Sequence, residues 1–363
     1  MVYSSFFSLL RLALGTNAET ADLDSLTKSE WVSLVDIAFE QGVAAILVEG
    51  LQNAGVNALL DSDELEDLRY EIFGEALASE EDYKKHQQVI ERLADLFYRE
   101  KIEMLLLKGY GLSLNYPIPA HRLMGDIDIY LYGNGGIGDR LAQKYFKCEV
   151  KQNEDKHSVF QINGISVENH ACFVNVCEHP SLNGLNDFLI KEAGKGLKQS
   201  IENSSIVLPT AMFNAMFIPF HCAGHFVRGE ASLKQFCDWV CFVQKYSSEI
   251  DWSTVEVKAK EAGFWQFFCC LNGIVQDYLG VASPLLPEWP RDKELEARIL
   301  KEILAPRKVV KSLLGKVYRF FASGWKYKMV YNDNMLIASI RRAKAYLRRK
   351  DEGAESIWEL NDK

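Results

Sequence analysis

The feature that most constrains this 363-residue chain is a change in the spacing of its hydrophobic residues near Ile102. Before that point, apolar residues recur every three to four positions, which is the spacing of amphipathic helices. Between about 102 and 175 they form short runs or alternate with polar residues, as in β-strands. Helical spacing returns after Pro180. The chain is therefore predicted to be α+β, with a small mixed β-sheet core between two helical regions.

Four regions are predicted from these patterns: an N-terminal helical region 1–100, an α/β core 101–180, a C-terminal helical domain 181–285 and a basic helical tail 286–363. Three prolines in SPLLPEWP mark the last boundary. Thr27 or Ser29 is suited to cap a helix over 30–43. A longer helix is expected over about 64–100, with apolar residues at four-residue spacing: Leu68, Ile72, Ala76, Val89, Leu93 and Phe97.

The core region contains a regular series of strand and turn signals. IEMLLL is typical of a buried strand, and it ends at the turn Lys108–Gly109 before a short helix over 110–116. DIDIYLY alternates polar with apolar residues, as a half-buried strand does. After the glycine-rich turn NGGIG, a helix is expected over 139–146. Two further strands flank Asn163–Gly164, a dipeptide that favours a tight hairpin.

Composition excludes several classes of protein. No apolar run approaches the ~20 residues of a membrane-spanning helix. Eight cysteines without a CxxC pair argue against a zinc ribbon or a disulfide framework. The apolar N-terminal run is interrupted by Arg11 and lacks a preceding basic segment, so we expect a helix there rather than a signal peptide, and a cytoplasmic protein.

Charge is unevenly distributed along the chain. Residues 305–363 carry 14 Lys and Arg against 6 Asp and Glu, whereas the whole chain has a net charge of −9. The remainder is therefore strongly acidic, which argues against duplex nucleic acid as a partner. The basic tail is expected to dock on the acidic body, and contact with an anionic membrane surface is the alternative.

The residues that indicate chemistry lie between Leu105 and Tyr132 and in the hairpin. Asp126 and Asp128 are two apart on a predicted strand, so their carboxylates share one face and suit Mg²⁺, or Mn²⁺ in its place. Glu168 is expected to supply a third carboxylate if its strand lies beside theirs. Metal ions held by such carboxylates promote in-line phosphoryl displacement. The turn Lys108–Gly109 offers backbone N–H groups to a phosphate.

These residues also resemble a known group of enzymes. LLLKG, Tyr116-Pro117, Arg122 and GDIDI, at these spacings, resemble the uncharacterised bacterial nucleotidyltransferase family, which shares the nucleotidyltransferase core of the DNA polymerase β superfamily. The likeness continues at VENH (167–170) and more loosely at HCAGHF and KQFCDW. It covers most of residues 100–245. One departure is Gly109-Tyr110-Gly111, where the superfamily usually has Gly-Ser or Gly-Gly.

The resemblance implies Mg²⁺-dependent transfer of a nucleoside monophosphate from ATP or another NTP to a small-molecule or protein acceptor, with release of pyrophosphate. Asp126 and Asp128 would bind the metal. Glu168 would complete the metal site or accept the proton of the acceptor. Lys108, Gly109 and Arg122 would hold the triphosphate.

Several side chains have two interpretations. Arg122 is suited either to clamp a phosphate or to pair with a carboxylate. His225, Arg228, Lys234 and Asp238 are expected either to face the cleft and hold the nucleotide or to belong to packed helices. His221 and His225 have metal-ligand spacing, but Cys222 stands where a zinc protease needs Glu.

Two other functions compete with the enzyme. One is a catalytically degenerate nucleotide-binding or regulatory protein of the same fold, similar to an antitoxin that binds a second chain. The other is a peripheral membrane adaptor that acts through the basic tail.

Overall fold

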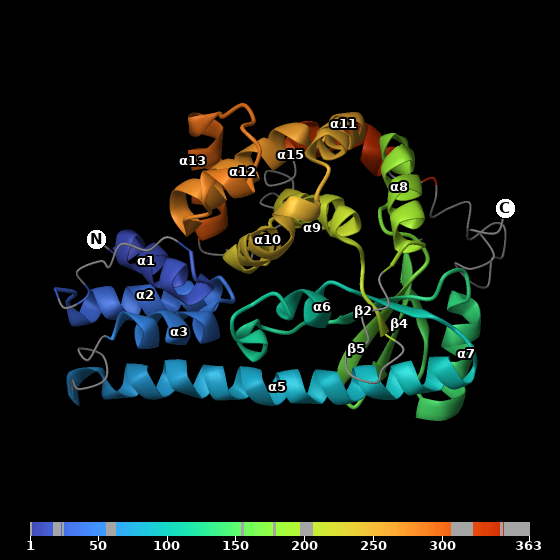
Figure 1. Ribbon diagram of the computed structural model, residues 1–363, viewed down its shortest axis with the longest axis horizontal. Coiled ribbons are helices and arrows are strands. Elements are labelled where there is room, and N and C mark those ends of the chain that lie inside the picture. Colours follow the sequence, from blue (N-terminus) through green and yellow to red (C-terminus); the bar gives the residue numbers. More distant parts are fainter. Residues whose placement is uncertain are drawn as a thin grey trace.

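The computed structural model describes residues 2–55 apart from 17–22 and 24, and residues 63–153, 156–176, 179–196, 206–305, 322–341 and 344. Within these ranges the fold is α+β, as predicted, with helices on both faces of one mixed sheet (Figure 1). Of the predicted basic tail, residues 306–321, 342–343 and 345–363 lie outside the described residues.

The N-terminal helices are α1 (Val2–Leu14), α2 (Lys28–Glu40), α3 (Ala44–Ala54) and α5 (Glu66–Arg99). Thr27 caps α2 in a capping box with Glu30, because each side chain accepts a hydrogen bond from the other residue's backbone N–H. Helix α5 has 34 residues and runs beneath both the N-terminal helices and the sheet (Figure 1). It thus connects the helical region to the core.

The sheet has six strands in the order β3-β4-β5-β2-β1-β6. Their bounds are β1 Met104–Leu107, β2 Ile127–Tyr130, β3 Lys151–Asn153, β4 His157–Ile162, β5 Ile165–His170 and β6 Ile206–Val207. Strand β2 is antiparallel to β1 and parallel to β5, while β4 and β5 form the hairpin predicted around Asn163–Gly164. The central position of β2 places its polar side chains between β1 and β5.

Two helices connect the strands, α6 (Gly109–Ser113) and α7 (Gly135–Phe146). Helix α7 begins four residues earlier than predicted, because the NGGIG segment forms its first turn and Gly138 donates its N–H to the carbonyl of Asn134. A Cβ on Gly138 would overlap the side chain of Leu131. The glycine that indicated a turn therefore allows a helix to pack closely against β2.

The two faces of the sheet have different neighbours. One face carries Ile127, Ile129 and Val167, which form a core with α5 and α7. The other face faces the C-terminal helices, and Phe173, which follows β5, packs there against Phe213 of α9. The apolar residues of DIDIYLY therefore anchor the strand from one side and leave the aspartates on the other.

The C-terminal helices are α8 (Asn183–Ala193), α9 (Ala211–Arg228), α10 (Leu233–Tyr246), α11 (Trp252–Ala262), α12 (Trp265–Leu279), α13 (Lys293–Leu304) and α15 (Gly324–Tyr331). They lie above the sheet in Figure 1. One continuous core joins them to α1, α2 and α3. The N-terminal and C-terminal helices are therefore packed as one body, although they are separated in sequence by the sheet.

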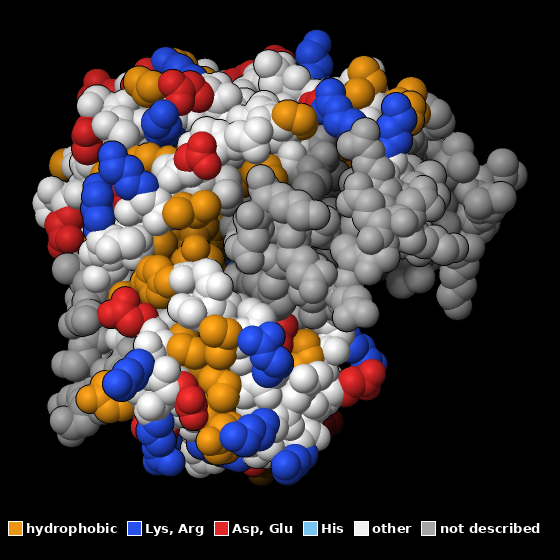
Figure 2. Space-filling view, turned by 90° about the vertical axis from the view of Figure 1, so that its right-hand side faces the viewer, with side chains coloured by type: hydrophobic (Ala, Val, Ile, Leu, Met, Phe, Trp, Pro, Cys, Tyr) orange, Lys and Arg blue, Asp and Glu red, His pale blue; other side chains and the backbone are white. Residues whose placement is uncertain are grey.

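The described helices are all too short or too polar to cross a membrane. The face that includes α7 and α8 shows hydrophobic side chains interspersed among charged ones (Figure 2).

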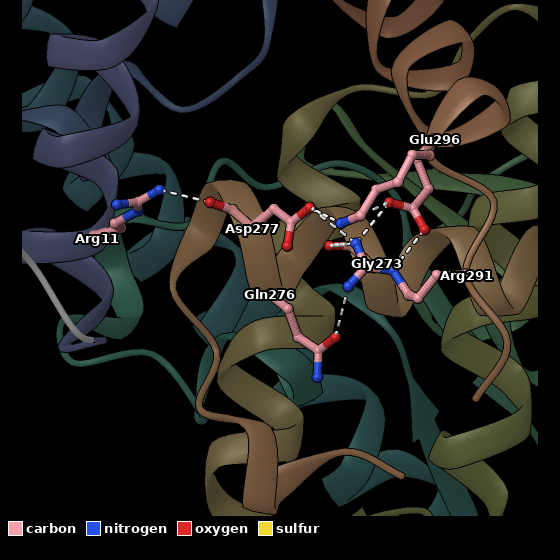
Figure 3. Close-up of polar contacts among 7 residues, drawn as sticks. Arg11, Gly273, Gln276, Asp277, Arg291 and Glu296 are labelled. Atoms are coloured by element: carbon pink, nitrogen blue, oxygen red, sulfur yellow. Dashed lines mark hydrogen bonds and ion pairs between the residues drawn. The ribbon is translucent and has the colours of Figure 1, made fainter. Parts of the chain in front are cut away.

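A polar cluster joins α1, α12 and α13 (Figure 3). The guanidinium of Arg291 donates two hydrogen bonds to the buried carboxylate of Glu296, each at 2.6 Å, and one to the carbonyl of Gly273. Arg11 of α1 donates to the carbonyl of Asp277 at 2.7 Å. Because a buried carboxylate is costly without a partner, this cluster ties α13 to α12.

Replacing Gly273 with alanine is expected to destabilise the fold. An added Cβ would overlap the Glu296 carboxylate and lie 2.5 Å from Nε of Arg291, so the ion pair would have to move. Overpacking of this kind costs about 1–3 kcal/mol. Urea unfolding followed by circular dichroism measures the change.

The matched control is Gly74→Ala, on the exposed side of α5, where an added Cβ meets open space. This substitution is expected to leave the protein as stable or slightly more stable, because alanine favours a helix by about 0.5–1 kcal/mol. Equal unfolding midpoints for both variants would contradict the packing argument.

Candidate active site

Three carboxylates meet on the sheet face that points toward the C-terminal helices. Asp126 immediately precedes β2 and is exposed, whereas Asp128 lies within β2 and is buried. Asp128 pairs in register with Leu107 of β1 and with Glu168 of β5. Residues directly opposite on neighbouring strands have adjacent side chains on one face. The structure therefore brings together the three acidic residues predicted from the sequence.

Asp128 is held by two cationic or hydrogen-bonding neighbours. Its Oδ1 lies 2.7 Å from Nζ of Lys108 and 2.8 Å from Nε2 of His170. Burial alone would raise the pKa of Asp128, but Lys108 and His170 outweigh it and hold the pKa below its usual range. The carboxylate is therefore ionised at neutral pH in spite of its burial.

Lys108 reaches Asp128 from a strained turn. Its φ of 42° is in the left-handed region, which is uncommon for a residue with a Cβ, and Gly109 follows with a φ of 37°. A Cβ on Gly109 would lie 3.4 Å from the backbone carbonyl oxygen of Asp126. The turn thus runs directly beside the start of β2, and strain of this kind is concentrated at functional sites.

The other two carboxylates have opposite electrostatic balances. Partial desolvation and repulsion from Glu168 and Asp128 raise the pKa of Asp126, and a hydrogen bond with Ser166 opposes them. Burial would also raise the pKa of Glu168, but the hydrogen bond with His170 helps to lower it below its usual value. Asp126 is therefore the member of the group that most lacks a compensating cation.

Two histidines flank Glu168. His157 of β4 lies 3.4 Å from Oε1 and His170 of β5 lies 3.5 Å from Oε2, both through Nε2. His157 was missed by the sequence reasoning. Its position follows from the hairpin, because pairing Ile162 with Ile165 across a two-residue turn places His157 opposite His170.

Lys156 is a further basic residue beside this group. Burial, together with the nearby charge of Lys108, lowers the pKa of Lys156 to about 8. Its carbonyl accepts a hydrogen bond from the N–H of Ala171, which holds the end of the hairpin.

Helix α9 covers the carboxylate face with residues spaced four apart. Phe213 and Phe217 pack on Phe173, and His221 and His225 continue the same stripe. The Nε2 atoms of the two histidines are 2.9 Å apart. Burial and the nearby charge of Lys108 lower the pKa of His221.

Arg122 is engaged in a buried ion pair. Its Nε and one terminal nitrogen donate to the two carboxylate oxygens of Asp238 on α10, at 2.6 and 2.8 Å. The hydroxyl of Tyr116 donates to the same carboxylate at 2.7 Å. Of the two interpretations of Arg122, the structure contains the pair with a carboxylate.

The remaining predicted residues, His225, Arg228 and Lys234, have other contacts. Arg228 is half-exposed and donates to Glu230 at 2.7 Å, and His225 lies 3.3 Å from the same carboxylate. The backbone carbonyl of Lys234, at the start of α10, accepts from Tyr116 at 3.5 Å. Nucleotide binding by His225, Arg228 and Lys234 stays a prediction.

A hollow lies beside Lys108, between α6, the start of α9 and the end of α10. Its polar lining comes from Lys108, Asn115, Asn214, Lys245 and Tyr246. Apolar residues such as Leu106, Leu112 and Phe242 form the rest of the lining, so the hollow leaves one side of Lys108 open to both kinds of group.

Arg122→Met is expected to lower the free energy of unfolding by about 3–5 kcal/mol, because it leaves the buried Asp238 carboxylate without its cation. Arg228→Met is the matched control, since it breaks an exposed pair worth about 0–1 kcal/mol. Urea denaturation compares the two. If Arg122→Met unfolds at the wild-type midpoint and instead weakens nucleotide binding, the phosphate-clamp interpretation is correct.

Comparison with known proteins adds the family. No curated protein and no solved structure was found to match the chain. One family model matches residues 27–280, most of the described helices and the entire sheet, and is described as an uncharacterised nucleotidyltransferase. The resemblance seen in the motifs is thereby confirmed. The chain belongs to the uncharacterised nucleotidyltransferase family.

Proposed function

We propose that the protein is a metal-dependent nucleotidyltransferase that uses an NTP. An oxygen of the acceptor forms a bond to the α-phosphorus, the bond from that phosphorus to the bridging oxygen breaks, and pyrophosphate leaves. The proton of an acceptor hydroxyl passes to a nearby base. The observation that carries this proposal is the convergence of Asp126, Asp128 and Glu168 beside the Lys108–Gly109 turn, in a chain of this family.

The residues fit a divalent cation. Asp126 and Asp128 are hard oxygen donors on one face, and Asp126 is exposed and lacks a full cationic partner. Mg²⁺ or Mn²⁺ bound there would neutralise charge that develops on the phosphate oxygens. The ion pair with Lys108 at 2.7 Å supports an ionised Asp128 carboxylate, as a metal ligand requires.

Lys108 and Gly109 are proposed to hold the triphosphate. The turn runs beside Asp126, where its backbone N–H groups would be offered to a phosphate, and the ammonium group of Lys108 lies beside Asp128. Because Asp238 occupies the fork of Arg122, we propose that Arg122 positions the 116–122 segment instead of contacting phosphate. His225, Arg228 and Lys234 are proposed to act from the opposite, helical side.

Glu168 is proposed to stabilise the metal site or to accept the acceptor's proton. Its pKa is lowered, so it is ionised at neutral pH, as both roles require. The hollow beside Lys108 is proposed to admit the acceptor, whose reacting group is a hydroxyl or a phosphate on a small molecule or a protein.

The first test is calorimetric titration with ATP, GTP, CTP and UTP, with and without Mg²⁺. Binding of at least one nucleotide is expected to require the metal and to weaken by about 10²-fold or more in Asp126→Ala. Asp126 is the sharper position for this variant because it is exposed, so its loss leaves the fold intact. Loss of turnover is expected to accompany loss of binding.

Asp95→Ala serves as the control, because Asp95 is an exposed acid on α5, away from this sheet face. It is expected to bind nucleotide like the parent protein. Full metal-dependent turnover in Asp126→Ala would contradict the assignment.

A degenerate, regulatory protein is the second candidate, and one observation favours it. The ammonium group of Lys108 contacts Asp128 Oδ1 directly, so it competes with a metal for that oxygen. In a regulatory protein this ion pair would be permanent and the site would bind neither metal nor NTP. The function of the protein would then be to bind a partner chain, without nucleotidyl transfer.

Lys108→Met separates the two candidates. Methionine has similar length and the same backbone cost at a positive φ, so the main change is loss of the charge. For the enzyme, NTP affinity is expected to fall by about 10-fold or more, because a charge-assisted phosphate contact is lost. A gain in metal binding, without any NTP binding in either protein, would favour the degenerate candidate.

A further inference from the structure

We propose that His157, Glu168 and His170 form a second cation position, beside the Asp126–Asp128 pair, that takes a first-row transition metal ion such as Zn²⁺. The inference deepens the proposed function, on which it rests for the role of the metal in catalysis. Metal binding itself can be measured without nucleotide.

The geometry brings the three donors to one point. One ligand atom from each of His157, Glu168 and His170 lies within 4.8 Å of the other two. Both imidazoles approach Glu168 through Nε2, one toward each carboxylate oxygen. Their rings are 5.2 Å apart between centroids. Side chains on two strands of a tight hairpin thus converge on a single carboxylate.

The contacts of His170 indicate which of its nitrogens would bind a metal at this point. Its Nδ1 lies 3.4 Å from the carbonyl oxygen of Cys172, and a carbonyl oxygen only accepts hydrogen bonds. Nε2 donates a hydrogen bond to Oδ1 of Asp128 at 2.8 Å and lies 3.5 Å from Oε2 of Glu168. A metal ion at this position would replace the hydrogen on Nε2, and Nδ1 would then carry the hydrogen and donate it to the carbonyl of Cys172. A backbone carbonyl on the outer nitrogen is the usual support of a metal-bound histidine.

The donor chemistry differs from that of the aspartate pair. Two imidazoles and one carboxylate are the ligands found around Zn²⁺ and around non-haem iron, whereas Mg²⁺ prefers oxygen ligands. His170 is buried and His157 is half-buried, so the position is sheltered from bulk water. A site with this set is expected to discriminate against Mg²⁺.

The arrangement also assigns Glu168 a role as a metal ligand, rather than as the base that accepts the acceptor's proton. With both of its oxygens directed to imidazoles, Glu168 belongs to the histidine group and leaves Asp126 and Asp128 to the metal that accompanies the nucleotide. Two cations about one carboxylate group are a recurrent arrangement in phosphoryl-transfer enzymes.

The test uses the full-length chain, freed of metal with a chelator, and Co²⁺ as the probe. Co²⁺ is expected to bind one equivalent in this position, with visible absorption bands, to be displaced by Zn²⁺, and to resist a large excess of Mg²⁺. Cu²⁺ bound in its place is expected to show nitrogen couplings from imidazole in pulsed electron paramagnetic resonance. Nitrogen couplings distinguish this position from a site made only of carboxylates.

His157→Ala and His170→Ala are each expected to weaken Co²⁺ binding by about 10²-fold or more and to remove nitrogen couplings. His170→Ala also removes one of the two partners of the buried Asp128, so His157→Ala and His157→Gln decide the matter if that variant fails to fold. His225→Ala is the control and is expected to bind Co²⁺ normally.

Absence of Co²⁺ binding, or unchanged binding in both His157 variants, would overturn the inference and leave the histidines as partners of the carboxylates alone. Loss of binding in His225→Ala would place the metal on α9 instead. The outcome is separable from that of the proposed function. Co²⁺ binding without any nucleotide turnover would support the histidine site and contradict the proposed nucleotidyltransferase activity. Turnover without Co²⁺ binding would support that activity and contradict the histidine site.

Discussion

The buried carboxylate of Asp128, at the centre of the sheet, determines which side chains must surround it. Asp128 lies on the middle strand, and an ionised group removed from water is costly unless charges and hydrogen bonds compensate it. Lys108, in the turn that follows β1, and His170, on β5, supply that compensation. The strained backbone at Lys108 is consistent with this requirement, because the turn directs the ammonium group back toward the strand.

Different helices cover the two faces of the sheet. Helix α5 and helix α7 hold the apolar face, so the strands stay in register while their polar side chains remain on the opposite side. Helix α9 extends two phenylalanines onto that side and then two histidines, which makes it both a packing element and a wall of the candidate site. The Arg122–Asp238 ion pair joins the 116–122 segment, which precedes β2, to α10 of the helical domain.

Local patterns predicted much of this arrangement. The period of two in DIDIYLY placed Asp126 and Asp128 on one face, and Asn163–Gly164 predicted the hairpin that carries Glu168. Helix α7 was predicted to start too late, since NGGIG has the composition of a turn and only its packing against Leu131 shows why glycine is needed there. Arg122 had two partners that suited its chemistry equally well, and the choice of Asp238 depends on a residue more than a hundred positions away.

The sequence by itself determined the fold class, the shared face of the aspartates and the family motifs, because periodicity and turn chemistry act over a few residues. Only the tertiary structure decided which strands are neighbours, and therefore that Glu168 lies beside Asp128 and that His157 and His170 converge on it. It also decided that the N-terminal and C-terminal helices share one core. The physical reason is that strand order and helix docking depend on the burial of surfaces from distant segments, and no local pattern contains that information.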